Sequence, residues 1–328
     1  MNNKPEQRKP KFLEYTNAEA ERMKRLDRLG TARNYACAAR RFADYLKTQG
    51  KRDVAFSRLR PQQIRGFEEW LKKDGVSHNT SSAYLRCLHA VFMRAAAKGL
   101  AASDPFTGTY RGVAKTTKRA VASDDLRTIA DIDIRAALLC RYQMANKKTD
   151  GAQFQQKVDK LTYARDMFLF CFCARGMTFV DVAYLRKSDI RCGLITYRRR
   201  KTGQRLMVKV EADMQAIFDR YPSTTGYQFP ILTDSLDRQA TYKSYLSAVA
   251  YYNDALNELG DLVGLKLTSY VSRHSWATIA HQNDIPLSVI SQAMGHDSQH
   301  TTEIYLKSLS SNRIDQANHA LLQTLFHT

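Results

Sequence analysis

The chain of 328 residues is poor in proline and has no paired cysteine motif. Its 6 cysteines include no CxxC pair, which argues against a zinc site or a disulfide framework, so we expect small buried side chains in a reducing cytosol. Apolar runs are too short to cross a bilayer, and the N-terminus lacks the apolar core of a signal peptide. Without a glycine-rich phosphate loop or a cluster of metal ligands, the sequence predicts a cytoplasmic protein that works without a metal or another cofactor.

Acidic residues are also scarce, and the charge is uneven along the chain. The formal net charge is +19, and residues 1–120 carry 26 Lys+Arg against 11 Asp+Glu, a net charge of +15 that leaves +4 for the rest. Lysine and arginine bind phosphates by releasing condensed counterions. The first third is therefore predicted to bind a polyanion, with a merely solvated basic face as the alternative.

Apolar residues recur at helical spacing over three stretches of this basic third, at residues 31–49, 61–75 and 77–99. Proline opens the second stretch, and glycine ends the second and third. The pattern predicts an all-helical domain over residues 26–104, preceded by a basic N-terminal arm at residues 1–25.

A basic segment without clear periodicity, residues 105–119, predicts a linker that lets two domains close around a duplex. Ser123 and the acidic residues after it are typical of a helix start, so we expect a second domain over residues 120–305. Polar residues at 143–160 indicate a loop on this domain.

A β-hairpin is predicted where residues 193–198 and 205–210, both rich in β-formers, flank the Gly-containing turn at Lys201–Gln204. Helical patterns return over residues 269–280 and 286–294. The predicted fold is mainly α with a small β-sheet or hairpin, an α+β architecture.

The last half of the chain carries reactive residues in a fixed order. Tyr305 comes nine residues after His296, and His296 follows Gly295 at the end of a predicted helix. The full set is Arg175, Lys201 on the hairpin, Tyr270, Arg273, His296 and Tyr305. This set resembles the tyrosine recombinases of the phage integrase family, whose pattern is an Arg, a hairpin Lys, His-x-x-Arg, a Leu-Gly-His-like turn and a Tyr nine residues after that His.

The resemblance implies a helical core-binding domain and a catalytic domain that together form a clamp on DNA. It further implies a site-specific recombinase, similar to integrases of mobile elements, that cleaves and rejoins DNA through a 3′-phosphotyrosyl intermediate and a Holliday junction. Expected partners are double-stranded recombination sites, three further copies of the chain in a homotetramer on DNA, and accessory DNA-bending or directionality proteins. The free protein is expected to be a monomer, and in the cell to be nucleoid-associated and not bound to a membrane.

Elementary chemistry supports these roles. Two guanidinium groups, from Arg175 and Arg273, can bind the non-bridging oxygens of a phosphodiester transition state. A tyrosine with an ordinary pKa of about 10 is ionised in roughly one molecule in a thousand at neutral pH, so Tyr305 needs help to lose its proton. The departing 5′ oxygen needs an acid, for which Lys201 is the candidate, and we expect Lys201 and His296 to do the proton transfers.

The sequence departs from the family pattern at two places, and two supporting roles are open. Tyr270 stands where most members have His and is expected to orient the phosphate, while Met294 replaces the commoner Leu. Thr178 holds the usual position of the family acid, so Asp181 is only a possible equivalent. His274 shares a predicted helix face with Tyr270 and Arg273, as an active or a packing residue.

DNA contacts and the C-terminal tail complete the prediction. The apolar stripe within residues 306–328 predicts a tail helix that docks on a neighbouring protomer or folds back on its own domain. Two other functions share these features: a type IB topoisomerase that relaxes DNA as a monomer, and a non-catalytic DNA-binding regulator on the same fold. The residues expected to contact DNA are Arg33, Arg40, Arg41, Lys115, Lys118, Arg119, Arg198 and Arg200.

Overall fold

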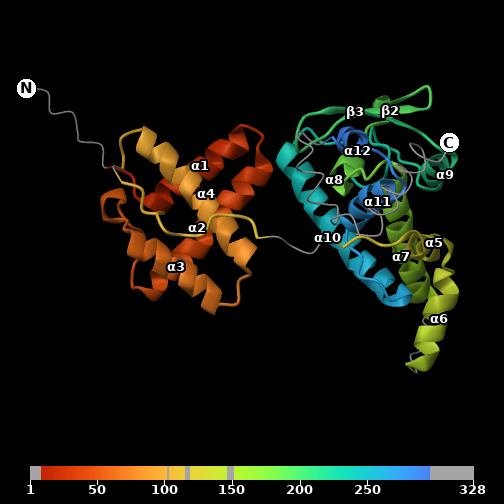
Figure 1. Cartoon of the computed structure of the whole chain (residues 1–328), viewed down its shortest axis with the longest axis horizontal. Coiled ribbons are helices and arrows are strands. Elements are labelled where there is room, and N and C mark those ends of the chain that lie inside the picture. The colour runs from red at the N-terminus through yellow and green to blue at the C-terminus, as the bar shows by residue number, and fades with distance from the viewer. Residues whose placement is uncertain (1–8, 102, 115–118, 146–150, 296–328) are drawn as a thin grey trace, which may run out of the picture. The chain divides into compact units, whose positions relative to one another are not determined.

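Two units with separate hydrophobic cores make up the chain (Figure 1). The computed structural model describes residues 9–101, 103–114, 119–145 and 151–295. The N-terminal unit extends over Met1–Thr116 and the C-terminal unit over Thr117–Thr328. Each unit is described by itself below.

The N-terminal unit is helical, as the sequence predicts. Its elements are α1 (Phe12–Arg25), α2 (Leu29–Thr48), the 3-10 turn η1 (Phe56–Arg58), α3 (Pro61–Lys73) and α4 (His78–Ala97). Pro61 occupies the first turn of α3, where its missing N–H is not needed, and the hydroxyl of Ser77 accepts a hydrogen bond from the Thr80 N–H at the start of α4. The three helices predicted from periodicity, now α2, α3 and α4, are thus confirmed.

Helix α1 corrects the prediction of a basic arm over residues 1–25, which is wrong for residues 12–25. Phe12 and Met23 are fully buried, and Phe12 packs edge-to-face against Phe42 and Phe56. Apolar side chains at helical spacing on this segment are typical of an amphipathic helix. The many lysines and arginines around them make the pattern hard to recognise in the sequence. The Asp53 carboxylate accepts hydrogen bonds from the first-turn N–H groups of α1, which fixes where the helix begins.

The predicted linker is also wrong for its first part. Phe106 is fully buried in the N-terminal core, and the Gly112 carbonyl accepts hydrogen bonds from Ser82 and Arg86 on α4. The Asn79 side chain both donates to and accepts from the backbone of Ala114. These bonds hold residues 105–114 on α4, since backbone groups of the segment find side-chain partners on that helix.

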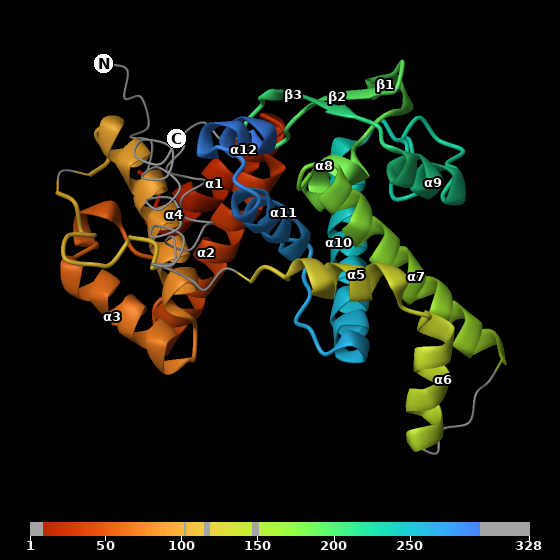
Figure 2. The ribbon, with the colours of Figure 1, turned by 45° about the vertical axis from the view of Figure 1, so that its right-hand side comes forward.

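The C-terminal unit combines helices with one small antiparallel sheet (Figure 2). The sheet has the order β1-β2-β3, and β2 and β3 form the predicted hairpin, in register from Leu194 opposite Lys209 to Arg198 opposite Arg205. The elements are α5 (Ser123–Asp131), α6 (Ile134–Met144), α7 (Gly151–Cys173), α8 (Phe179–Ala183), η2 (Lys187–Asp189), β1 (Ile190–Arg191), β2 (Leu194–Arg198), β3 (Arg205–Lys209), α9 (Ala212–Arg220), α10 (Arg238–Val263), α11 (Val271–Gln282) and α12 (Leu287–Met294). The α+β architecture is confirmed.

Helix α7, the central element of this core, contains residues 151–160, for which the predicted loop over residues 143–160 is therefore wrong. Phe154, Val158 and Leu161 are buried at the spacing i, i+4, i+7, so the polar-looking run is the first part of an amphipathic helix. Further along α7, Phe168 and Phe170 are fully buried. Both views show α7 and α10 running side by side, with the β2–β3 hairpin and α12 near one end and α6 at the other (Figures 1 and 2).

The cysteine side chains differ in their exposure to solvent. Cys171 is buried, but Cys140 and Cys192 are exposed, so the prediction that all cysteines are buried is wrong. Cys140 lies on the solvent-exposed side of α6, and Cys192 lies in the tight turn between β1 and β2. Within the described ranges, no helix is both long and apolar enough to cross a membrane.

A buried carboxylate joins α1 to α4. Glu19 is 4% exposed and accepts hydrogen bonds from Arg22 at 2.9–3.1 Å and from Arg94 at 3.2 Å. Burial alone would raise the pKa of Glu19, but the hydrogen bonds from Arg22 and the charges of Arg22, Arg94 and Lys98 outweigh it, so this pKa lies below its ordinary value. Stability from a lowered carboxyl pKa is present above the ordinary pKa and is lost as the pH falls through the folded-state pKa.

We expect Glu19→Gln to lower the free energy of unfolding at neutral pH by about 1–3 kcal/mol, because charge-assisted hydrogen bonds to a buried group are lost. Its stability should also change less than that of the wild type as the pH falls below about 4.5. Urea denaturation of the full chain at several pH values measures both effects. The exposed neighbour Glu21, paired with Lys24, is the control, and a Glu21→Gln loss equal to that of Glu19→Gln would contradict this role.

Candidate active site

Arg273 on α11 is the hub of the candidate site. Its side chain is 2% exposed, and its guanidinium donates one hydrogen bond to the Gly176 carbonyl and one to the Met294 carbonyl, both at 2.6 Å. The Gly176 carbonyl lies in the turn after α7, and the Met294 carbonyl lies at the end of α12. One side chain therefore joins three segments that are far apart in the sequence.

Arg175 lies in the turn between α7 and α8. Arg175 and Gly176 both have left-handed backbone angles, with φ of 57° and 70°. A Cβ on Gly176 would lie 3.1 Å from the Cα and the Cγ of Arg273, so glycine permits both the turn and the close approach of α11. The Arg175 guanidinium donates to the Met207 carbonyl of β3 at 3.3 Å, which places Arg175 between α11 and the hairpin.

Helix α12 ends at the same place. Gly295 has φ of 65° and caps the helix in the left-handed conformation. The last carbonyls of a helix have no partner within the helix and carry its negative dipole end. Here Arg273 donates to the Met294 carbonyl, and Arg199 donates to the Gly295 carbonyl at 2.6 Å.

Arg199 was missed by the sequence analysis, which singled out its neighbours Arg198 and Arg200. It is 5% exposed, whereas both neighbours are exposed. Strand periodicity could have found it, because Ile195 and Tyr197 are buried on the same alternating face of β2. The run of three arginines hid this alternation.

The turn of the hairpin carries Lys201. Arg199 closes the turn through backbone hydrogen bonds with Gly203 and Gln204, at 2.7 and 2.8 Å, and Lys201 is exposed at the tip. The Arg198 guanidinium donates back to the Gly203 carbonyl at 3.3 Å. The Arg200 guanidinium lies 3.7 Å from the ring centre of Tyr184, a cation–π contact.

Asp181 on α8 holds this turn through a hydrogen bond to its backbone. It is 4% exposed, accepts a hydrogen bond from the Thr178 hydroxyl at 2.5 Å, and accepts one from the Arg200 backbone N–H at 2.8 Å. Both carboxylate oxygens are thus used to join the start of α8 to the hairpin. This placement fits a structural support for the site.

Tyr270 and His274 lie on the α11 side of the site. Tyr270 is 46% exposed at the N-terminal end of α11, and its ring centre lies 6.0 Å from that of His274, which is buried. The two residues follow the i, i+4 spacing that the sequence predicted to share a face with Arg273. His296 and Tyr305, together with Lys115 and Lys118, lie outside the described residues.

The apolar interior below the hairpin changes the pKa of Tyr197, which lies on β2. Burial raises the pKa of Tyr197 well above its ordinary value, and the nearby Asp181 carboxylate raises it further, against the charges of Arg273 and Arg199. Tyr197 therefore stays neutral at physiological pH and serves as packing beneath two cationic side chains. In residues 151–295 and the other described ranges, no cluster of His, Cys, Asp and Glu is arranged to hold a metal.

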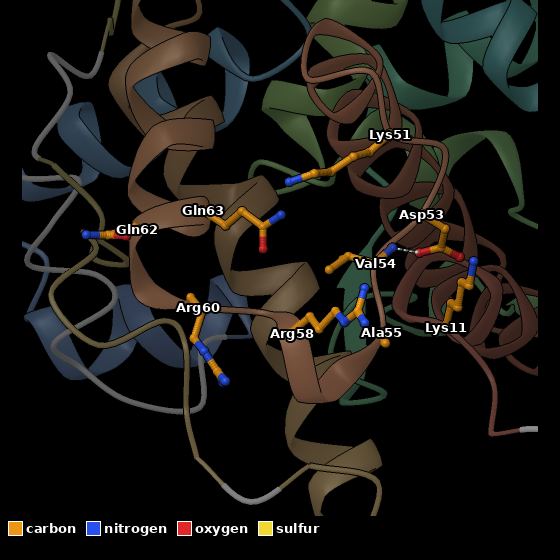
Figure 3. Close-up of a pocket in the computed structure, with 9 residues that line it drawn as sticks. All are labelled: Lys11, Lys51, Asp53, Val54, Ala55, Arg58, Arg60, Gln62 and Gln63. Carbon is orange, nitrogen blue, oxygen red and sulfur yellow. Dashed lines mark hydrogen bonds between the residues drawn. The ribbon is translucent and has the colours of Figure 1, made fainter.

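The N-terminal unit presents a separate basic pocket. Lys51, Arg58 and Gln63 extend around its opening, and Asp53, the one acid in its lining, accepts hydrogen bonds from backbone N–H groups of Leu13, Glu14 and Val54 (Figure 3). No sequence pattern singles out these residues, since they come from a turn and two helix ends. The basic residues that line the pocket are Lys11, Lys51, Arg58 and Arg60.

The predicted DNA contacts on helix α2 differ in their surroundings. Arg33 and Arg40 are exposed, while Arg41 forms an ion pair with Asp74 and stacks over Trp70 at 4.6 Å. Arg119 is exposed at the start of the described part of the C-terminal unit. Arg41 is therefore engaged within its own unit.

Comparison with known families gives the class of this protein. Residues 11–115 match the phage integrase SAM-like domain, and residues 153–312 match the phage integrase family. The chain belongs to the phage integrase family. The resemblance drawn from the ordered residue set is thus confirmed.

Individual relatives are distant. The chain is 28% identical over 149 residues to the tyrosine recombinase XerA of Thermococcus onnurineus (strain NA1), a match to 44% of this chain and 52% of that protein. The chain thus matches about half the length of this curated relative. Among solved structures, the fold is similar to the integrase of transposon Tn1549 in complex with a circular intermediate DNA (TM-score 0.61, 13% identity, 94% of this chain and 99% of that one). It is also similar to a lambda integrase tetramer bound to a Holliday junction (TM-score 0.59, 13% identity, 94% and 82%).

The close contact between Gly176 and Arg273 gives a test of the site's construction. Gly193 has a similar φ of 72°, but a Cβ there would meet nothing within 4 Å. We expect Gly193→Ala to cost about 1–2 kcal/mol for the left-handed backbone alone. Gly176→Ala should cost about 1–3 kcal/mol more, because the Arg273 backbone must move.

Urea denaturation of the two variants beside the wild type measures this difference. Equal losses at the two glycines would show that the contact with Arg273 adds nothing to the cost of the left-handed backbone.

Proposed function

We propose that this protein is a site-specific DNA recombinase of the integrase type, in which Tyr305 attacks the scissile phosphate. The phenol oxygen forms a bond to phosphorus, the bond to the 5′ oxygen breaks, and a 3′-phosphotyrosyl intermediate results. Attack by the 5′-hydroxyl of a partner strand then reverses the step and produces a Holliday junction. The bond energy is retained in the protein–DNA link, so the reaction needs no ATP.

The convergence on Arg273 is the observation that best supports this proposal. Arg273 and the hairpin turn with Lys201 are attached to the C-terminal end of α12, and Arg273 also binds the carbonyl of Gly176, the residue next to Arg175. The Arg175 guanidinium donates to Met207 of the hairpin. His296 follows this end directly in the sequence, and Tyr305 comes nine residues later. The proposal is supported because Arg273 and the turn that carries Lys201 are both attached to the end of α12, from which the chain continues to the proposed nucleophile.

Each of the proposed site residues would meet one demand of the reaction. Arg175 and Arg273 would bind the non-bridging oxygens, where negative charge gathers in the transition state. Lys201, exposed at the tip of the hairpin, would donate a proton to the leaving 5′ oxygen, and His296 would accept the phenol proton. Tyr270 would orient the phosphate, and Asp181 would hold the hairpin.

Both units would contact the DNA duplex. The N-terminal unit would use Arg33, Arg40 and the basic pocket lined by Lys11, Lys51, Arg58 and Arg60, since cations set against phosphates supply most of the affinity for DNA. Integrases in the compared structures are bound to DNA as dimers and tetramers. We propose a homotetramer on DNA for this chain, with the tail at 306–328 docked on a neighbouring protomer, and action at the bacterial or phage chromosome in the cytoplasm.

The nucleophile is tested with a nicked suicide substrate that traps the covalent protein–DNA adduct. We expect the wild type to form the adduct and Tyr305→Phe to bind the same DNA with normal affinity but form none, because only the hydroxyl is removed. Denaturing gel electrophoresis detects the adduct, and mobility shift measures binding. An adduct that persists in the Phe variant would disprove the assignment.

The arginine pair makes a separate prediction. Arg175→Ala and Arg273→Ala should each slow adduct formation by on the order of 10²–10³-fold, as for loss of a charge donor to a transition state. Single-turnover rates at saturating protein measure this effect. Because Arg273 also donates to two buried carbonyls, its unfolding midpoint must be compared with that of the Arg175 variant, and near-normal rates in both variants would contradict the clamp.

Two other functions are separated by direct assays. A type IB topoisomerase would relax supercoiled plasmid that lacks any recombination site, and would do so as a monomer. A non-catalytic regulator would retain its biological activity in the Tyr305→Phe variant. Sequencing of junctions formed in cells with candidate sites would identify the recombination target.

A further inference from the structure

Arg199 is a buried arginine at the base of the hairpin turn. Among the residues described here, its guanidinium forms no ion pair, and its one side-chain hydrogen bond goes to the Gly295 carbonyl at 2.6 Å. Burying a guanidinium costs free energy that an apolar side chain of similar length would avoid. A charge retained at such a cost points to a function other than stability.

The position of Arg199 suggests that function. Its backbone N–H and carbonyl close the hairpin turn with Gln204 and Gly203, and Lys201 lies two residues further on. Its side chain donates to Gly295, while Arg273 donates to the adjacent carbonyl of Met294. The hairpin turn and Arg273 are thus attached to consecutive carbonyls at the end of α12.

The other anchors of the turn lie on different elements. The Asp181 carboxylate accepts from the Arg200 N–H, and the Arg200 side chain stacks on Tyr184. These contacts join the turn to α8 and its C-terminal end, whereas Arg199 alone among the described hairpin arginines joins it to the end of α12. Removing the Arg199 guanidinium would leave the turn attached to α8 but free to move relative to Arg273.

We propose that Arg199 is a positioning residue that holds Lys201 at the correct distance from the phosphate bound by Arg175 and Arg273. This inference rests on the proposed function, in which Lys201 protonates the leaving 5′ oxygen. In that step the Lys201 ammonium gives its proton to the oxygen as the P–O5′ bond breaks, and the phenol proton passes to His296. Arg199 contributes no proton and contacts no reacting atom.

A leaving group that needs no proton separates this role from a general loss of structure. A suicide substrate with sulfur in place of the bridging 5′ oxygen expels a thiolate, whose conjugate acid has a pKa of about 8.5 and which therefore leaves without an acid. If only Lys201 is misplaced, adduct formation slows on the oxygen substrate alone, because the sulfur substrate needs no acid. If the whole site is distorted, adduct formation slows equally on both substrates.

The experiment compares single-turnover adduct formation on the oxygen and the sulfur substrate. Arg199→Met keeps the length of the side chain and removes the guanidinium, and we expect it to slow the oxygen substrate on the order of 10²-fold, as for loss of a positioned general acid. The sulfur substrate should react at close to the wild-type rate. Lys201→Met is the benchmark and should show the same pattern with a larger loss.

Two further variants complete the set. Arg199→Lys restores a donor that can reach the Gly295 carbonyl and should recover the oxygen-substrate rate to within about tenfold of wild type. Arg165→Met is the control, because Arg165, which is partly buried and paired with Asp166, also donates to a carbonyl, that of Ile132, away from the hairpin. It should lower both rates by the same factor, if it lowers them at all.

The outcomes are distinguishable. Equal slowing of both substrates by Arg199→Met, or no slowing of either, would overturn the positioning role while leaving the recombinase proposal intact. A Lys201→Met defect that sulfur does not relieve would overturn it as well, since Lys201 would then not be the acid. A wild-type protein that forms no adduct on either substrate would overturn both proposals.

Discussion

The two hydrogen bonds from Arg273 to the carbonyls of Gly176 and Met294 are the contacts on which the rest of the site depends. They satisfy a turn carbonyl and a helix-end carbonyl that have no other role in regular structure. Glycine at 176 permits this approach, because a Cβ there would lie only 3.1 Å from the Cα of Arg273. One buried guanidinium thus links the left-handed turn at Arg175 and Gly176, the end of α12 and helix α11.

The hairpin is fixed to this center by side chains rather than by a larger sheet. Three short strands expose much of their surface, and only Ile195, Tyr197, Leu206 and Val208 are buried along β2 and β3. Arg199 and Asp181 then determine where the turn lies, one through the Gly295 carbonyl and the other through the Arg200 N–H. The exposed Lys201 therefore lies on a turn that is held at its base by buried side chains.

The sequence predicted the class of fold and most of its helices because these depend on local patterns. Periodicity in α2, α3 and α4, and the paired β-runs around a glycine turn, were sufficient. The errors came where charge concealed apolar spacing, in α1 and in the first turns of α7, and where an irregular segment was assumed to be free. Residues 105–114 are held by Phe106 in the core and by the side chains of Asn79, Ser82 and Arg86, which no local pattern predicts.

The sequence by itself determined the family, through the order and spacing of Arg175, Lys201, Arg273, His296 and Tyr305, because a family pattern consists of residue types at fixed intervals along the chain. Only the tertiary structure decided which of three consecutive arginines turns inward, that Asp181 holds the hairpin, and that Arg41 is engaged by Asp74 and Trp70. The physical reason is that composition and spacing record which groups are present, whereas burial and hydrogen-bond partners are set by residues that lie far away along the chain.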